Sequence, residues 1–457
     1  MANLPKRCSA AEAAQLVARL GEEFAVVRNP GYIHPPYELY PLAPRAVTPL
    51  PELAAVVSDM DGTTTTTEHL CVYSLDYMVR RMTGRLGRED WPGLGDRDHP
   101  HVIGNSTTKH VEYLVDAYGA SLDRQAFLEA LVESILWTLA LSRDDTRRGE
   151  AQTTATILGI DELIRSQPAA ALMRDKSFTM EQLRQVAHGL ASGSLDTFHA
   201  TERGDLVRGG IEIYYARYHQ ILEGIGQGQA ETLARRLLGE GRRLIEPMPG
   251  VGLFLSAVKG LITPGEAGTL FDACAADLLR AKGRPVPEAG AMNSMRADFV
   301  KAVEGFNARP VPVAIVTSSL AYEARIVLAE LFAVVRGMMA DWPIPPASRD
   351  KLLEKFASPD DLYDGILTAT DSSEIRLKPH RDLYSMALHR LGIGTERFGH
   401  VLGLEDSESG VIGIRAAGIG LAVAVPFDQT LGHDLSAATK LCPGGLPQVM
   451  FEERFFI

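Results

Sequence analysis

LAAVVSDMDGT, residues 53–63, is the stretch that decides the fold. Residues 53–57 are apolar, which is typical of a strand buried within a parallel sheet. Asp59 and Asp61 follow where that strand ends, and a Gly-Thr turn comes after them. Ligands of open α/β sheets bind outside the carboxyl ends of the strands, so the two aspartates lie where a site is expected. Two carboxylates one residue apart can point the same way there, which sets a nucleophile beside a proton donor and leaves oxygens to hold a hard cation.

Further strand patterns appear late in the chain. They cover residues 313–316, 365–367, 400–404 and 420–425. Helical patterns lie between them, which implies βαβ units and a parallel sheet. Pro312 is expected at or before the first residue of its strand, because proline is disfavoured within a central strand. We therefore predict an α/β fold: a Rossmann-like, doubly wound parallel sheet with an inserted, mostly α-helical cap domain.

The middle of the chain lacks strand patterns. It shows helical spacing instead, most clearly at residues 124–141, and a Pro-Met-Pro-Gly cluster at 247–250 marks the return to the sheet. The predicted domains are a catalytic core of residues 1–67 and 246–457 and a helical cap of residues 68–245. Within the core, residues 261–310 form an insertion long enough to carry helices of its own.

Residues 1–50 are an N-terminal extension of the predicted core. Residues 15–27 have some helical pattern, and residues 29–51 are rich in Pro and Tyr, which indicates an extended segment on the surface. We interpret this segment as a packing strap. The alternative is that it reaches the active site through Tyr37 and Tyr40.

Composition limits the partners. The formal net charge of −12 argues against nucleic acid and anionic membranes as partners, although one bound cation can still attract a small anionic substrate. No apolar run reaches the length of a membrane span. The N-terminus lacks an apolar signal core, and the four cysteines are scattered without metal-type spacing, so we expect a cytoplasmic protein. The sequence carries no signal for the oligomeric state.

The polar residues at the predicted strand ends fit phosphoryl transfer. Asp59 would attack phosphorus, and Asp61 would protonate the leaving oxygen and later deprotonate water. The hydroxyl of Thr317 and the amide of Ser318 could hydrogen-bond the phosphoryl oxygens. Lys378 would supply a positive charge to the same oxygens.

A third strand end adds the acids for a cation. Glu405 and Asp406 follow the strand at 400–404, and Mg²⁺ prefers a few carboxylates together with water and phosphate oxygens. Taken singly, the polar segments also fit a turn, helix caps, an exposed lysine and an acidic loop. Their joint occurrence near strand ends favours one catalytic site.

Taken in this order, the segments resemble the haloacid dehalogenase superfamily, and within it the β-phosphoglucomutase-like and phosphoglycolate-phosphatase-like branch. The resemblance covers residues 54–68, 249–254, 313–319 and 377–427, including LKP at 377–379, LGI at 391–393, LEDSESG at 404–410 and AAG at 416–418. It implies Asp59 as the nucleophile and Asp61 as the general acid and base. It also implies Thr317 and Lys378 as phosphate ligands.

The same resemblance implies Mg²⁺ as the cofactor. Its ligands would be Asp406, the Asp59 carboxylate and the backbone carbonyl of Asp61. Glu405 stands where some members have another metal contact.

The resemblance also makes the helical region a cap that closes over the site and selects the substrate. Residues 102–108 look like the substrate-facing loop of such caps, and a helix N-cap at Ser106 or Thr107 explains them equally well. The candidate substrate contacts are Gly104, Asn105, Ser106 and Lys109. This cap is longer than is usual in the branch.

The leading hypothesis is a magnesium-dependent phosphatase, a phosphoric monoester hydrolase acting on a small phosphorylated metabolite through an aspartyl-phosphate. Asp61 argues against a dehalogenase, whose pattern lacks a carboxylate there. The nearest alternative is a sugar-phosphate mutase of the β-phosphoglucomutase type. Such mutases tend to carry a hinge histidine shortly after the nucleophile; here Cys71 stands near that place and His69 is out of step, which favours hydrolysis. A third hypothesis, from another class, is a non-catalytic binding protein on the same scaffold.

Overall fold

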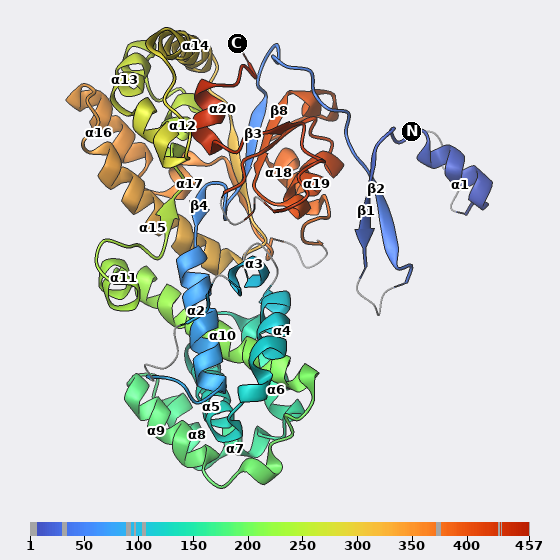
Figure 1. Cartoon of the computed structure of the whole chain (residues 1–457), viewed down its shortest axis with the longest axis vertical. Coiled ribbons are helices and arrows are strands. Elements are labelled where there is room, and N and C mark those ends of the chain that lie inside the picture. Colours follow the sequence, from blue (N-terminus) through green and yellow to red (C-terminus); the bar gives the residue numbers. More distant parts are fainter. Residues whose placement is uncertain are drawn as a thin grey trace. The chain divides into compact units, whose positions relative to one another are not determined.

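The structure is a computed structural model that describes residues 7–29, 34–87, 93–95, 97–102, 107–371, 376–427, 430 and 432–456. The chain forms two compact units (Figure 1). The first comprises Met1–Thr66 and Glu246–Ile457, and we call it the α/β unit. The second comprises Thr67–Ile245, and we call it the helical unit.

A six-stranded sheet forms the centre of the α/β unit. Its strands are β3 (Ala55–Asp59), β6 (Val313–Val316), β7 (Gly365–Leu367), β8 (Val401–Glu405), β9 (Leu421–Ala424) and β10 (Lys440–Leu441). They lie in the order β10-β9-β8-β3-β6-β7, and every neighbouring pair is parallel. Every residue of β3, β6, β8 and β9 is buried, which is why these strands read as apolar runs and not as an alternation. The predicted Rossmann-like α/β fold with a helical insertion is confirmed.

The winding of the chain puts a switch point beside β3. From β3 the chain moves outward through β6 and β7, then returns to the other side of β3 as β8 and continues outward. Asp59 is in register with Val316, and Ser58 is in register with Leu404. The residues that follow Val316 and Leu404 therefore flank the end of β3. In sheets of this kind, the place where the winding reverses is where ligands bind.

Helices cover the sheet of the α/β unit (Figure 1). They are α12 (Val251–Val258), α15 (Ala321–Met339), α16 (Pro346–Lys355), α17 (Pro359–Leu362), α18 (Asp382–Arg390), α19 (Glu408–Ala416) and α20 (Gly445–Phe451), with a 3₁₀ turn η3 (Thr395–His400). A short antiparallel ribbon of β4 (Thr65–Thr66) and β5 (Glu246–Pro247) completes the unit.

The stretch from 261 to 310 carries two helices, α13 (Pro264–Ala281) and α14 (Ala289–Ala308). A proline at the first position of α13 and the Thr263–Glu266 capping box fix where α13 begins. The rings of Phe271 and Phe299 meet Phe451 of α20 edge-on, with centroids 5.0 and 5.3 Å away. This aromatic contact fastens the helical pair to the α/β unit.

The N-terminal segment differs from its sequence pattern. The structure has a helix α1 (Ala10–Val17) followed by a hairpin of β1 (Phe24–Arg28) and β2 (Tyr37–Pro41), with Val26 opposite Leu39. The helical expectation for residues 15–27 therefore holds only at residues 15–17 and is wrong over residues 18–27. Pairing with β2 and packing of Ala25 against Ala416 decide the conformation of β1, and neither contact is visible in local spacing.

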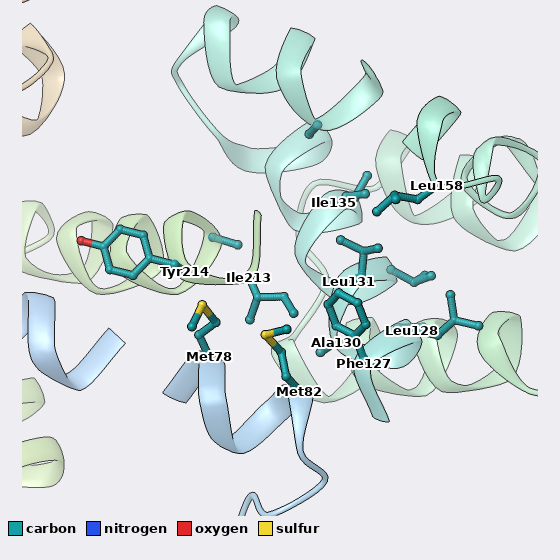
Figure 2. Close-up of a cluster of buried hydrophobic side chains, with 14 of the residues drawn as sticks. Met78, Met82, Phe127, Leu128, Ala130, Leu131, Ile135, Leu158, Ile213 and Tyr214 are labelled. Carbon is teal, nitrogen blue, oxygen red and sulfur yellow. The ribbon is translucent and has the colours of Figure 1, made fainter. Parts of the chain in front are cut away.

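The helical unit consists of helices only among its described residues. They are α2 (Glu68–Met82), α3 (His99–Val102), α4 (Thr107–Tyr118), α5 (Arg124–Leu141), α6 (Asp145–Ile157), α7 (Asp161–Arg165), α8 (Gln167–Arg174), α9 (Met180–Ala191), α10 (Arg203–Gly226) and α11 (Ala230–Leu238), with 3₁₀ turns η1 (Gly119–Ser121) and η2 (Leu195–Thr197). The predicted helix at 124–141 is α5, which is buried on most of its surface. Its side chains meet those of α2 and α10 in one apolar core (Figure 2). Across the described chain, we find no helix with the length and apolarity that a bilayer crossing requires.

Two buried glutamates of the helical unit form matched pairs with arginines. Arg147 Nη2 lies 2.6 Å from Glu212 Oε2, and the Thr154 hydroxyl donates to Glu212 Oε1 at 2.9 Å. Arg81 Nη1 lies 2.7 Å from Glu133 Oε2. Glu212 and Glu133 thus each lie beside an arginine that offsets their charge.

Candidate active site

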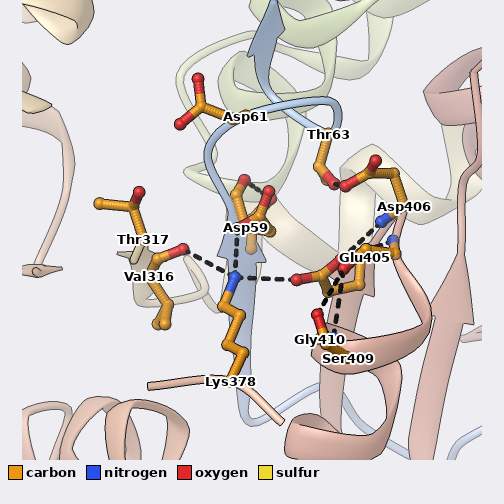
Figure 3. A network of polar contacts seen from close by, with 12 residues as sticks. Asp59, Asp61, Thr63, Val316, Thr317, Lys378, Glu405, Asp406, Ser409 and Gly410 are labelled. Carbon is orange, nitrogen blue, oxygen red and sulfur yellow. Dashed lines mark hydrogen bonds and ion pairs between the residues drawn. The ribbon is translucent and has the colours of Figure 1, made fainter. Parts of the chain in front are cut away.

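The site lies at the carboxyl end of the sheet, beside the switch point. Asp59 is the last residue of β3, Thr317 follows β6, and Glu405 ends β8 with Asp406 next to it. Lys378 reaches the same place from the segment before α18 (Figure 3). Three strand ends and one loop thus bring the predicted core residues together.

Lys378 is the electrostatic centre of the site. Its side chain is 7% exposed, and its ammonium contacts Asp59 Oδ1 and lies 2.8 Å from Glu405 Oε1. The same nitrogen is 5.2 Å from the ring centroid of Tyr384, which turns its face to the charge. A lysine so enclosed is held as a fixed positive point at the end of β3 (Figure 3).

Glu405 accepts hydrogen bonds on both of its oxygens. Oε1 accepts from Lys378 and, at 3.1 Å, from the Tyr384 hydroxyl. Oε2 accepts from the amides of Asp406 and Ser407, both at 2.8 Å, and from the Ser407 hydroxyl at 2.9 Å. A Cβ on Gly410 would lie 1.6 Å from Oε1, so only glycine leaves room for this carboxylate. Glu405 therefore joins Lys378 to the loop after β8.

Asp406 faces the loop that follows β3. Its Oδ1 accepts from the Thr63 hydroxyl at 3.4 Å. Gly62 has φ +86°, and a Cβ there would lie 2.5 Å from the Asp406 carboxylate. Glycine is needed on both counts: it adopts the left-handed backbone and lets the loop pass against the acid.

Asp61 and the segment after β6 lie on the other side of Asp59. In Figure 3, the Asp61 carboxylate points away from Asp406. The Ser319 hydroxyl donates to Asp61 Oδ2 at 3.4 Å, and the Ser319 amide donates to Thr317 Oγ1 at 3.0 Å. Ser318 lies in the turn between these two residues. The structure thus brings Asp61, Thr317 and Ser318 to the end of β3, as expected from sequence.

Among the described residues, the site holds more carboxyls than basic groups. Burial raises the pKa of the Asp59 carboxyl well above its usual range, with Lys378 acting against this and Glu405 adding to it. Burial, then Glu405 and Asp59, raise the pKa of Asp406 in the same way. Burial also acts to raise the pKa of Glu405, but Lys378 and the Ser407 donors outweigh it and hold that pKa below its usual value. One ammonium cannot neutralise three buried carboxyls.

The residues fit a hard divalent cation. One oxygen from each of Asp59, Glu405 and Asp406 lies within 4.8 Å of the other two. Buried carboxylates in excess of their basic partner are the donor set that Mg²⁺ takes in proteins. A cation here would lower the pKa of Asp59 and Asp406 and keep both ionised.

The expected substrate residues belong to the helical unit. Gly104, Asn105 and Ser106 fall outside the described residues. Lys109 is exposed on α4 of the helical unit. Its role toward a substrate stays a prediction.

Three contributors were not singled out by sequence. Thr63 and Ser319 hold the carboxylates of Asp406 and Asp61, and the resemblance could have pointed to them because both lie within its motifs. Tyr384 contacts Glu405 and Lys378 from α18, and its sequence environment is that of an ordinary helical core residue.

Of the comparisons with known proteins, the one with solved structures found similar proteins. No family model matches the sequence, and no curated protein matches it closely enough to count as a relative. Among solved structures, CbbY from Rhodobacter sphaeroides in complex with phosphate is 13% identical, with a TM-score of 0.35, over 88% of this chain and 100% of that one. A HAD hydrolase of family IA, variant 3, from Entamoeba histolytica is 12% identical, with a TM-score of 0.32, over 85% of this chain and 92% of that one.

The chain is similar to haloacid dehalogenase hydrolases. A β-phosphoglucomutase described as putative, from Thermotoga maritima, is a further neighbour, with 14% identity and a TM-score of 0.33 over 88% of this chain and 99% of that one. The haloacid dehalogenase enzymes are the superfamily that the sequence motifs resemble.

Proposed function

We propose that this protein is a magnesium-dependent phosphatase that hydrolyses a small phosphorylated metabolite through an aspartyl-phosphate on Asp59. One observation carries the proposal: Asp59, Glu405 and Asp406 form a buried cluster at the switch point of the sheet, and the Lys378 ammonium contacts the first two. Such an arrangement offers a nucleophile, a fixed positive charge and donors for a cation in one place.

In the first step a carboxylate oxygen of Asp59 attacks phosphorus and the bond to the ester oxygen breaks. Asp61 gives its proton to the departing oxygen, so a neutral alcohol leaves. The Thr317 hydroxyl and the Ser318 amide, at the end of the neighbouring strand, bind phosphoryl oxygens. The Lys378 ammonium offsets the charge that these oxygens carry.

In the second step water attacks the phosphorus of the aspartyl-phosphate. Asp61, now ionised, takes the proton of that water, and the bond from phosphorus to the Asp59 oxygen breaks. Inorganic phosphate leaves, and both aspartates return to their starting states. The Ser319 hydroxyl keeps the Asp61 carboxylate beside the end of β3 through both steps.

Mg²⁺, when bound, would neutralise charge on the phosphoryl group and on the nucleophile. Asp59, Asp406 and the Asp61 backbone carbonyl are its proposed ligands, with Thr63 holding Asp406 in place. Glu405 has donors on both oxygens, so we assign it first to the placement of Lys378 and the Ser407 turn. The helical unit, with Lys109 and residues 104–106, is proposed as the cap that selects the substrate.

The test is a screen of phosphorylated metabolites and of p-nitrophenyl phosphate, with and without Mg²⁺, on wild type and Asp59→Asn. The proposal expects phosphate release that requires Mg²⁺ and is lost in the variant. Hexose 1-phosphates separate the alternatives, because free phosphate supports hydrolysis and an isomerised sugar phosphate supports a mutase. Absence of magnesium-dependent turnover with every ester would favour the non-catalytic binding protein instead.

A further inference from the structure

The N-terminal hairpin contacts the segment that carries Lys378. The ring of His380, two residues after the lysine, meets the ring of Tyr40 on β2 with centroids 5.2 Å apart, and its Nδ1 contacts the Tyr40 hydroxyl. On the other side of the lysine, Arg376 Nη1 lies 3.3 Å from Glu38 Oε2, also on β2. The hairpin thus holds residues on both sides of Lys378, although some 340 residues separate them in sequence.

These contacts form one ordered chain of hydrogen bonds. The Tyr40 hydroxyl donates to Glu38 Oε2 at 3.0 Å, so its oxygen is left to accept from Nδ1–H of His380. Burial, then the Glu38 carboxylate, raise the pKa of Tyr40 to about 12, so the hydroxyl keeps its proton. Burial and then Arg376 lower the pKa of His380, so the ring is neutral and has one N–H to give. The pair Glu38–Arg376 is half exposed and adds little by itself.

The hairpin is itself fixed to the sheet. Arg415 of α19 is fully buried; its Nε donates to the carbonyl of Ala43 at 2.9 Å, and its Nη2 lies 2.8 Å from Glu23 Oε2. The Ala43 amide donates back to the Arg415 carbonyl at 2.9 Å. Since α19 begins directly after Asp406 and Ser407, this anchor belongs to the same framework as the acids of the site. We call residues 23–29 and 34–46 the strap.

We propose that the strap positions the catalytic lysine: Tyr40, held by Glu38, fixes His380 and thereby sets where the Lys378 ammonium stands relative to Asp59. This inference rests on the proposed function, in which that ammonium offsets phosphoryl charge. Tyr40 and His380 are positioning residues and do not touch the phosphoryl group. Loss of the Tyr40 hydroxyl leaves the Tyr40 ring packed but removes its hydrogen bond to His380, which frees the turn at residues 377–380. The Lys378 ammonium then also occupies positions farther from the charge that develops on the phosphoryl oxygens.

The experiment compares Tyr40→Phe with Tyr37→Phe, its matched control. Tyr37 lies on the same strand, but its side chain is 52% exposed. For hydrolysis of p-nitrophenyl phosphate with Mg²⁺, Tyr40→Phe should lower kcat about tenfold with little change in KM, because the lysine acts mainly on charge that develops in the transition state. Tyr37→Phe should match wild type. In a His380→Gln background, Tyr40→Phe should have no further effect on kcat, since the two side chains act as one unit.

A second measurement does not depend on turnover. Hydrogen–deuterium exchange at residues 377–384 should be faster in Tyr40→Phe than in wild type and Tyr37→Phe, while β3 and β8 remain unchanged. Unchanged exchange there, or faster exchange without a fall in kcat, overturns the positioning role while the phosphatase stands. A wild-type protein without magnesium-dependent turnover overturns the proposed function itself, and the positioning role falls with it.

Discussion

The two units bury charged side chains in opposite ways. In the helical unit, the buried Glu212 and Glu133 each lie beside an arginine, Arg147 and Arg81. In the α/β unit, Asp59, Glu405 and Asp406 form a buried group of three carboxyls. Among the described residues, the Lys378 ammonium contacts two of them, Asp59 and Glu405. Matched pairs serve the packing of a fold, whereas an unbalanced group costs stability and points to a ligand that completes it. The difference between the two units shows that an excess of buried carboxyls over basic groups, and not burial alone, points to a functional site.

The largest effect is expected when an acid is removed from the unbalanced group of Asp59, Glu405 and Asp406. Asp59→Asn should lower kcat for p-nitrophenyl phosphate by at least about 10³-fold, because an amide cannot form the aspartyl-phosphate. The free energy of urea unfolding should stay equal or rise, since burial disfavours the ionised form of this carboxyl. A fall in stability as large as that of a core substitution would show that Asp59 is structural and would break the comparison.

Removing one partner of a matched pair should lower the stability of the fold and leave the activity unchanged. Arg147→Met leaves Glu212 buried and unpaired, which should lower the unfolding free energy by about 3–5 kcal/mol. Phosphate release per folded molecule should not change. Arg165→Ala is the control: that arginine is 72% exposed beside Asp161, and its loss should cost less than about 1 kcal/mol. The double variant Arg147→Met with Glu212→Leu should regain most of the loss; if it does not, the pair is more than a neutralised charge.

His110 sharpens the comparison because it is buried in the helical unit without a charged partner. Neither ring nitrogen has a hydrogen-bond partner among the described residues, and burial lowers its pKa from 6.5 to about 4. Below pH 6.5 the unfolded chain takes up a proton that the folded chain refuses until about pH 4. The unfolding free energy should therefore fall with decreasing pH across this window, by up to about 3 kcal/mol in total.

The measurement for His110 is urea unfolding at several pH values, with His110→Leu as the matched variant. The difference between wild type and variant should widen as the pH falls from 6.5 toward 4. Parallel pH profiles for the two proteins would mean that this ring titrates normally in the folded state.

The smallest expected effect is that of the cation on stability. Mg²⁺ at ten times its dissociation constant should raise the unfolding free energy by about 1.4 kcal/mol, since it binds the folded site. Asp406→Asn should abolish this gain, because it removes a proposed ligand. Glu162→Gln, in the helical unit, should retain it. Equal stabilisation of Asp406→Asn and wild type would place the cation elsewhere.

Five of the six strands of the sheet, and the polar strand ends of the site, were predictable because their signals are local, whereas the short edge strand β10 was not predicted. A short apolar run rich in β-branched residues, such as 313–316, indicates a buried strand, and its end at Thr317 follows from the same residues. Lys378 was found through a short motif that resembles a family and not through spacing alone. In each case the decisive residues lie within a few positions of one another.

The rest depends on contacts between distant parts of the chain. β1 is a strand because it pairs with β2 and packs on α19, and its own residues fit a helix as well. Tyr384 and the contact of Tyr40 with His380 arise when segments far apart in sequence meet. Periodicity reports which face of an element is buried, but it does not say which other element covers that face.

Arg415 has a practical consequence for anyone who wishes to shorten the protein. It is 0% exposed, and its guanidinium is satisfied largely by Glu23 and the carbonyl of Ala43. A version that begins after residue 46 would retain every residue assigned to catalysis, yet it would leave a cation in the interior with too few acceptors. Such a truncation is expected to yield insoluble material, so the amino-terminal arm should be kept in any expression or crystallisation trial.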